Sequence, residues 1–199
     1  MKLKFSPSVA QIQKVSYAKE EEENFLLDCG DGCSPYGCSE KVAQALKDVD
    51  IHDVSAYPHG FALKDAIIRR WQAYVPLTYD MLYLHNSGMD AIACVNTIFA
   101  RPGAAVVGIC PQFSDYLLSA RCHGFVYRPV YLKQEENFRL IPERVVAAID
   151  DAVSLVYLDN PNNPTGQSVT LDSMRMILDK AKDCLLYTSP SPRDTRYLV

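Results

Sequence analysis

The sequence predicts an α/β domain whose mostly parallel β-sheet is covered by helices on both faces. From about residue 81 onward, short apolar runs alternate with stretches whose apolar residues recur at helical spacing, an order typical of parallel sheets. The runs 104–109 and 155–158 are almost continuously apolar, as expected for strands buried on both faces. Neither an internal repeat nor a long linker interrupts this order.

The first part of the chain predicts two helices. Ser39 suits the N-cap of a helix that continues to about Val49. A second helix is indicated by apolar residues at helical spacing, namely Leu63, Ala66, Ile67, Trp71 and Tyr74. Before them, the first 24 residues include a polar helical stretch with an acidic run at 20–23, and residues 30–37 have loop composition.

The later elements follow in alternating order. The predicted strands are 81–85, 104–109, 125–132 and a strand around Leu155, and the predicted helices are 89–100, 114–122, 142–150 and about 170–182. Pro142 suits the first position of its helix. The last helix is expected to turn a core face inward, made of Leu171, Met174, Ile177 and Leu178.

Composition limits the kinds of partner. The chain has 199 residues, 48% of them apolar and 22% charged, with a net charge of −4, enough for one domain of ordinary globular composition. It has no basic cluster of the kind that binds nucleic acid, no apolar run of about 18 residues that could span a bilayer, and no signal-peptide pattern. We therefore expect a cytoplasmic protein without nucleic-acid or membrane partners.

The seven cysteines are odd in number, which favours reduced thiols over a disulfide framework. Cys29, Cys33 and Cys38 lack a usual zinc spacing and an obvious fourth ligand. No metal site is expected from them.

The most informative segment is 154–166, which reads S-L-V-Y-L-D-N-P-N-N-P-T-G. An apolar strand ends there and a turn with two prolines, Pro161 and Pro164, follows. Proline fixes its own φ angle and restricts the residue before it, so the turn is stiff. Asn162 and Asn163 place amide groups, which both donate and accept hydrogen bonds, at the carboxyl end of a strand, where open α/β sheets bind ligands.

This segment resembles the N-P-x-N-P-T-G signature of the class I/II pyridoxal-phosphate aminotransferases. The resemblance implies the aspartate-aminotransferase-like fold, here as an incomplete three-layer αβα large domain with an N-terminal arm. It implies pyridoxal 5'-phosphate as cofactor. It also implies that Asn163 donates a hydrogen bond to the phenolic oxygen of that cofactor, and that the Asn163–Pro164 bond is a candidate cis peptide.

Two further segments match the family in its own order. Ser87-Gly88-Met89-Asp90 lies at the start of a predicted helix, where free amides and the positive helix end suit a phosphate. By resemblance, the amides of Met89 and Asp90 hold the cofactor phosphate, and Gly88 lets the backbone approach it. Phe113, two residues after Pro111, matches the aromatic residue that stacks on the cofactor ring.

Two earlier segments also match. Tyr57-Pro58 resembles the family element whose tyrosine reaches the phosphate in the neighbouring subunit, which implies a homodimer. His59 beside it is expected to be a solvent-facing loop residue. The segment 27–39, with Tyr36 and Gly37, resembles the substrate-side loop of the histidinol-phosphate branch, although Ser34 stands where that loop usually has asparagine. The substrates implied are a small amino donor and a 2-oxo acid.

The lysine that holds the cofactor, its acidic partner and the substrate arginine lie beyond the N-P-x-N-P-T-G turn in this family. Here only Lys180 and Lys182 follow that turn, and both are expected on a solvated helix face, so no catalytic residue is assigned and this fragment is expected to be inactive. Pro190 and Pro192 argue against a central strand after residue 184, and the segment 185–199 resembles translated adapter sequence. The predicted divisions are 1–50, an arm and substrate-side loop; 51–184, a partial cofactor-binding domain; and 185–199, a non-native tail.

Three functions remain open at this stage. The leading one is transamination of histidinol phosphate with 2-oxoglutarate by the full-length parent. The others are decarboxylation of a phosphorylated amino acid of the threonine-phosphate type on the same fold, and non-catalytic binding of a phosphorylated ligand at 88–90.

Overall fold

The computed structural model describes residues 7–10, 12, 34, 36–101, 103–182 and 185–189. The chain forms two compact units, one made of Met1–Gln13 with Tyr83–Val199 and the other of Lys14–Leu82. In the described part of the chain, no helix is both long enough and apolar enough to cross a membrane.

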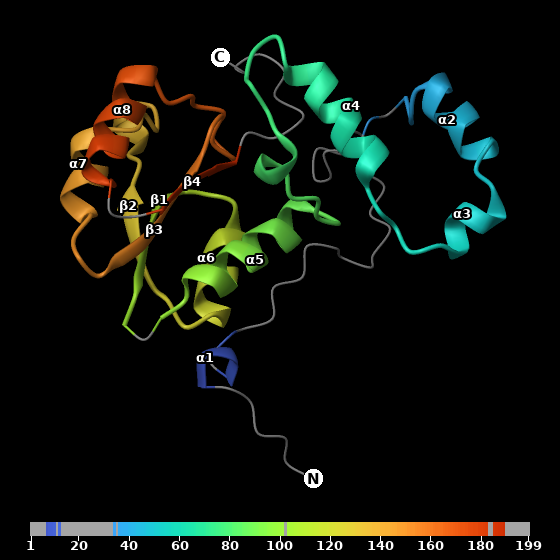
Figure 1. Cartoon of the computed structure of the whole chain (residues 1–199). Coiled ribbons are helices and arrows are strands. Elements are labelled where there is room, and N and C mark those ends of the chain that lie inside the picture. The colour runs from blue at the N-terminus through green and yellow to red at the C-terminus, as the bar shows by residue number, and fades with distance from the viewer. Residues whose placement is uncertain are drawn as a thin grey trace, which may run out of the picture. The chain divides into compact units, whose positions relative to one another are not determined.

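The first unit contains a four-stranded parallel sheet (Figure 1). Its strands are β1 (Ala105–Cys110), β2 (Val126–Tyr131), β3 (Val153–Asp159) and β4 (Leu185–Ser189). They lie in the order β2-β1-β3-β4, and each neighbouring pair is parallel. β1 and β3 are the central strands, and their residues are almost fully buried, which accounts for their uninterrupted apolar sequence.

Helices cover both faces of this sheet, as the alternating sequence predicts. The helices of the unit are α1 (Pro7–Ala10), α5 (Gly88–Phe99), α6 (Ser114–Cys122), α7 (Pro142–Ala148) and α8 (Leu171–Lys180), with a 3-10 turn, η2 (Gln134–Glu136). One core cluster joins β1 and β3 to Val145 of α7 and Ile177 of α8. The other cluster joins the opposite face to Ile92 of α5 and Tyr116 of α6. The αβα layering expected from the sequence is confirmed.

A buried polar network connects three elements within the second cluster. Asn96 of α5 is fully buried. Its amide nitrogen donates to Ser119 Oγ of α6 at 2.8 Å, and its amide oxygen accepts a hydrogen bond from the Tyr157 hydroxyl of β3. Because every polar atom named here has a partner, the network joins the two helices to the sheet without leaving a donor or acceptor unsatisfied.

One close approach in the sheet requires glycine. The Tyr127 side chain of β2 lies across Gly108 of β1, so an ideal Cβ at position 108 would come within 2.6 Å of Tyr127 Cζ and 2.8 Å of Gln112 Oε1. No ordinary packing contact is this short. Glycine at 108 is therefore what lets the tyrosine reach over its neighbouring strand.

The second unit contains α2 (Glu40–Lys47), α3 (Ile51–Ser55), α4 (Phe61–Trp71) and the 3-10 turn η1 (Tyr79–Met81). The N-cap prediction for α2 is confirmed, because Ser39 Oγ accepts a hydrogen bond from Val42 N–H at 3.4 Å. The helix predicted from the apolar spacing around Trp71 is α4. Its aromatic residue Trp71 packs edge to face with Tyr74, with ring centroids 6.0 Å apart.

Two expectations are wrong. Residues 81–85 form no strand, because Met81 ends η1 and residues 82–85 have no regular structure. A short apolar run does not by itself distinguish a strand from an irregular connection. The prolines after residue 184 were expected to exclude only a central strand. β4, which was not predicted, pairs with β3 from Leu185 to Ser189, lies at the sheet edge and ends before Pro190.

The second error concerns the inner face of α8. Ile177 is buried and Met174 packs against the core, but Leu171 is 60% exposed and Leu178 is 46% exposed. Leu178 directly follows Ile177, so it lies about 100° around the helix from the buried residue. The acidic run 20–23 and the residues Cys29 and Cys33 lie outside the described residues.

Candidate functional site

The strand order defines where this sheet can bind a ligand. The connection from β1 passes through α6 to β2, on one side of β1, whereas β3 lies on its other side. α6 packs on one face of the sheet, and α8, which follows β3, packs on the opposite face. The carboxyl ends of β1 and β3 are thus the topological switch point, where open α/β sheets bind their ligands.

Backbone pairing between these two strands ends early. The last paired residues are Gly108 and Tyr157, two residues before either strand ends. Pro111, which follows β1, has no N–H to donate. The side chain of Gln112 supplies a donor instead, because its Nε2 is 3.2 Å from the carbonyl oxygen of Tyr157.

Gln112 is held from two further directions. Its Nε2 also donates to Asp159 Oδ1 at 2.8 Å, and its Oε1 accepts a hydrogen bond from the Tyr127 hydroxyl at 2.9 Å. Burial raises the pKa of the Tyr127 phenol well above its usual range, and the nearby Cys110 thiol and Asp159 carboxyl raise it further. Tyr127 therefore remains a neutral donor to Gln112.

The proline-containing turn after β3 is organised by Asp159 and Asn162. Asp159 Oδ2 accepts a hydrogen bond from the backbone N–H of Asn163 at 2.8 Å. The Asn162 side chain is buried and donates to both carboxylate oxygens of Asp159 and to the carbonyl of Pro111, each at 3.2 Å. Its oxygen accepts from the N–H and the hydroxyl of Thr165. The amide group of Asn162 is thus hydrogen-bonded to other residues of the protein, whereas Asn163 is exposed.

The Asn163–Pro164 peptide is cis, as the resemblance implied. Two more cis bonds, Cys110–Pro111 and Asn160–Pro161, occur at the ends of β1 and β3. The sequence did not single these out.

Phe113 lies at the end of the segment that Gln112 anchors. It occupies the N-cap position of α6 and is half-buried against the second core cluster. Its ring meets that of Tyr116 edge to face, with centroids 6.2 Å apart, and the Tyr116 ring in turn lies 4.9 Å from that of Tyr157. The aromatic core below therefore restricts the orientation of Phe113.

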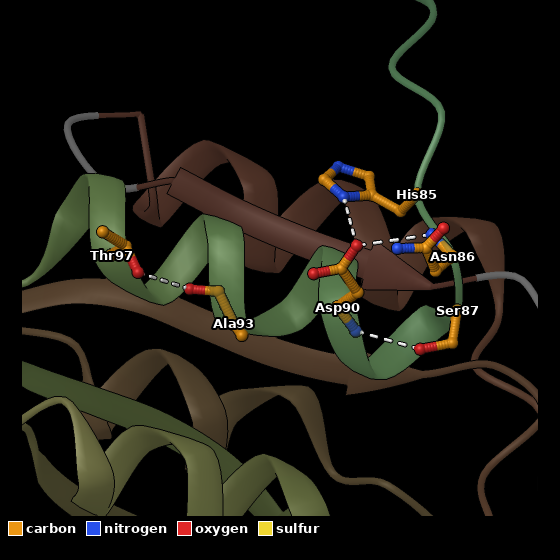
Figure 2. A network of polar contacts seen from close by, with 6 residues as sticks. All are labelled: His85, Asn86, Ser87, Asp90, Ala93 and Thr97. Atoms are coloured by element: carbon orange, nitrogen blue, oxygen red, sulfur yellow. Dashed lines mark hydrogen bonds and ion pairs between the residues drawn. The ribbon is translucent and has the colours of Figure 1, made fainter. Parts of the chain in front are cut away.

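The start of α5 is capped by two reciprocal side-chain hydrogen bonds, shown in Figure 2. Ser87 Oγ accepts a hydrogen bond from Asp90 N–H at 3.2 Å. Asp90 Oδ2 accepts one from Asn86 N–H at 3.3 Å and lies 3.4 Å from His85 Nδ1. This arrangement is a variant of the capping box, which satisfies donors that the helix itself cannot.

The first two amides of α5 remain outside the helical ladder. The first internal helical bond runs from Ala91 N–H to Ser87 O, so the N–H groups of Gly88 and Met89 have no carbonyl within the helix to bond. An ideal Cβ at Gly88 would meet no heavy atom within 4 Å. The backbone at this positive helix end is thus open to an anion, and its donors suit a phosphate.

α5 brings this end toward the ligand-binding edge of the sheet. Its last residue, Phe99, is joined to β1 by five residues, 100–104. A helix of 12 residues is about 18 Å long and a strand of six residues about 20 Å. If α5 runs antiparallel to β1, these lengths would bring its start near the level of the carboxyl end of the strand. Met89 and Phe113 both pack on the same core cluster.

The remaining candidates lie in the second unit. Tyr57 is 89% exposed, and Tyr36 is also exposed. Gly37 has a φ of +71°, in the left-handed region that favours glycine. In the first unit, Lys180 is the last residue of α8 and Lys182 lies two residues beyond it. Both are exposed, and Lys182 Nζ lies 3.3 Å from Asp179.

The fold and the carboxyl edge of the sheet define a parallel α/β protein. The start of α5 suits a phosphate, and the loops after β1 and β3 present Phe113 and Asn163. The family model "Aminotransferase class I and II" matches residues 25–188. The chain belongs to this family, whose members depend on pyridoxal 5'-phosphate. The match extends to 188 and so includes most of β4.

Individual relatives agree with this assignment. The chain is 30% identical over 155 residues to a histidinol-phosphate aminotransferase of Anoxybacillus flavithermus, covering 77% of this chain and 40% of the relative. It is 31% identical over 197 residues to a histidinol-phosphate aminotransferase of Methanopyrus kandleri, covering 92% of this chain and 50% of the relative. The chain thus spans half or less of the length of these curated relatives.

Solved structures show the same fold. Aspartate aminotransferase from Thermus thermophilus with maleate superposes with a TM-score of 0.59 at 25% identity, over 63% of this chain and 34% of that chain. An aromatic aminotransferase from Pyrococcus horikoshii superposes with a TM-score of 0.58 at 21% identity, over 63% of this chain and 35% of the other. The predicted aspartate-aminotransferase-like fold is confirmed.

Sequence reasoning missed three residues that organise this edge. Asp159, Gln112 and Tyr127 hold the two loops together, yet none was proposed as part of the site. Asp159 had a detectable signal, because it is an acidic residue at the end of a continuous apolar strand, directly before an Asn-Pro turn. Tyr127 had none, because its role depends on the neighbouring Gly108.

Proposed function

We propose that this chain is the amino-terminal portion of a pyridoxal-phosphate-dependent aminotransferase that transfers the amino group of histidinol phosphate to 2-oxoglutarate. The observation that carries the proposal is the switch point itself, where the loops after β1 and β3 are hydrogen-bonded together beside an open helix start. The names of the relatives from Anoxybacillus flavithermus and Methanopyrus kandleri support the choice of amino donor.

Each candidate residue has a role that its surroundings support. The amide of Met89 binds the cofactor phosphate together with that of Gly88. The Asp90 amide, which the resemblance also assigned to the phosphate, instead donates to Ser87 Oγ, and the Asp90 carboxylate holds the segment before the helix in place. Phe113 covers one face of the cofactor ring and excludes water from it. Asn163 donates its side-chain N–H to the phenolic oxygen of the ring.

When bound, pyridoxal 5'-phosphate supplies a pyridine ring that accepts electrons from the reacting carbon. The protein keeps that ring flat, dry and correctly oriented. Because Asn162 is bound internally by Asp159 and Thr165, the two asparagines divide the work: Asn162 fixes the turn and Asn163 faces the ligand.

The proposal extends to the whole protein. Tyr36 and Gly37 contact the substrate, Tyr57 reaches the phosphate bound by a second subunit, and the complete enzyme is a cytoplasmic homodimer. The fragment itself does not turn over, since its lysines 180 and 182 are solvent-exposed. The divisions 1–50, 51–184 and 185–199 stay predictions.

Two measurements test this proposal. The full-length protein encoded by the continuing reading frame should form glutamate from 2-oxoglutarate when given histidinol phosphate. Release of carbon dioxide from a phosphorylated amino acid without glutamate would favour the decarboxylase instead. For the chain itself, pyridoxal 5'-phosphate should produce no lysine-linked absorbance band. A band abolished by Asn163→Ala but not by Lys180→Ala would contradict the expectation of an inactive fragment.

A further inference from the structure

The carboxylate of Asp159 joins the two loops at the switch point. The residue is only 6% exposed. Oδ1 accepts from Gln112 Nε2 at 2.8 Å, Oδ2 accepts from the backbone N–H of Asn163 at 2.8 Å, and the Asn162 amide donates to both oxygens at 3.2 Å. The donors come from two segments about 50 residues apart in the chain, so the carboxylate links them, beside the bonds from Asn162 Nδ2 to the Pro111 carbonyl and from Gln112 Nε2 to the Tyr157 carbonyl.

A buried carboxylate is tolerated only where donors compensate its lost hydration. Here the partners are amide N–H groups, and hydrogen bonds to an ionised acceptor are roughly twice as strong as neutral ones. The charge therefore makes the loop-to-loop connection stiffer than an uncharged side chain of the same size would.

Of the two residues expected to face a ligand, Asn163 bonds to this carboxylate itself and Phe113 is connected to it through the neighbouring residue Gln112. The N–H bound to Asp159 belongs to Asn163 itself. Gln112, bound to the other oxygen, immediately precedes Phe113 in the chain. A shift of the carboxylate would thus move the Asn163 carboxamide and the Phe113 ring relative to each other.

We propose that Asp159 is a positioning residue that holds the Asn163 carboxamide and the Phe113 ring at the spacing required by a planar hydroxypyridine ring. This inference rests on the proposed function. Asp159 is expected to affect how the cofactor ring is oriented, and not how the cofactor phosphate is bound. The start of α5, where the phosphate binds, is organised by Ser87, Asp90 and His85, none of which is hydrogen-bonded to Asp159.

The test compares two ligands that differ in the ring. Pyridoxamine 5'-phosphate needs no lysine to bind, and inorganic phosphate contacts the helix start alone. Each is titrated calorimetrically into the 199-residue chain and into the variants Asp159→Ala and Asp159→Asn. Asp151→Ala is the matched control, because Asp151 is exposed and lies before β3, at its opposite end.

Asp159→Ala should weaken pyridoxamine 5'-phosphate about tenfold or more, a loss equivalent to one or two hydrogen bonds. Asp159→Asn keeps the volume and one acceptor oxygen, so its loss should be smaller. Inorganic phosphate should bind all variants equally, and Asp151→Ala should bind both ligands as the unsubstituted chain does. Hydrogen exchange at the Asn163 amide should accelerate in both Asp159 variants, which tests the connection without any ligand.

Several results would overturn the inference. Unchanged pyridoxamine 5'-phosphate affinity in Asp159→Ala would do so, as would an equal loss for both ligands, since that outcome indicates a purely structural role. An unchanged exchange rate at Asn163 would show that the carboxylate does not hold the turn. If the unsubstituted chain bound neither ligand, the proposed function itself would fail, and this inference with it.

Discussion

Replacing Gly108 by alanine tests the packing beneath the site. The added methyl group would lie 2.6 Å from Tyr127 Cζ and 2.8 Å from Gln112 Oε1, so both of these side chains must move. Gln112 is tied to Tyr157 and Asp159, and the Tyr127 ring packs against the second core cluster. Neither can move without losing contacts.

The expected effect can be estimated from two contributions. Overpacking of a well-packed site costs about 1–3 kcal/mol. If Tyr127 moves away, its hydrogen bond to Gln112 is also lost, which adds about 1 kcal/mol. The free energy of unfolding of Gly108→Ala should thus fall by about 2–4 kcal/mol.

Urea denaturation followed by far-ultraviolet circular dichroism measures this effect as a lower midpoint, by about 1 M, with an unchanged slope. Gly88→Ala is the control, because its methyl group would meet no atom within 4 Å and its midpoint should stay the same. Adding Tyr127→Ala to Gly108→Ala removes the shorter contact, with the tyrosine, so the double variant should be more stable than the sum of the single effects predicts. A Gly108→Ala midpoint equal to that of the unsubstituted chain would refute the reasoning.

Three further outcomes are expected. Tyr127→Phe should reduce the loss of stability at alkaline pH. Burial raises the pKa of this phenol in the folded state, so the stability that the neutral phenol contributes is complete below about pH 10 and is lost as the pH rises beyond that value. Equal alkaline stability profiles of the variant and the unsubstituted chain would contradict this. Asn96→Ala should lower the free energy of unfolding by about 2–4 kcal/mol, because it opens a cavity and removes the hydrogen bonds of Asn96 with Tyr157 and Ser119; in the Tyr157→Phe background the same substitution should cost measurably less in urea denaturation. Thr170→Ala should cost about 1 kcal/mol through loss of the N-cap bond to Ser173 N–H, and an unchanged melting temperature would count against that cap.

The fold was predictable wherever the sequence pattern reflects burial on both faces. The runs 104–109 and 155–158 were recognised as strands because every residue in them is apolar or small, and α6 was predicted with the bounds that the structure gives it. β4 was not among the predicted strands, because Pro190 and Pro192 were taken to exclude a central strand, whereas an edge strand can end just before a proline.

The site was predictable to the extent that its chemistry lies on the backbone. The amides at Gly88 and the braced turn at Asn163 follow from helix ends and prolines, which are local features. The connection through Asp159 and Gln112 joins segments far apart in the chain, and no local pattern encodes it. The sequence also did not indicate that the Asp90 amide is engaged by Ser87.

The early end of pairing between β1 and β3 has a mechanical consequence. Beyond Gly108 and Tyr157, no backbone hydrogen bond of the sheet ties the tips of the two strands to each other. Small backbone rotations can therefore change the distance between the tips while the lower part of the sheet keeps its register. The distance between the two strand tips is instead set by the side chains of Gln112, Asp159 and Asn162, which bond across the gap, so changing the length of one of them should change the size of the ring accepted there.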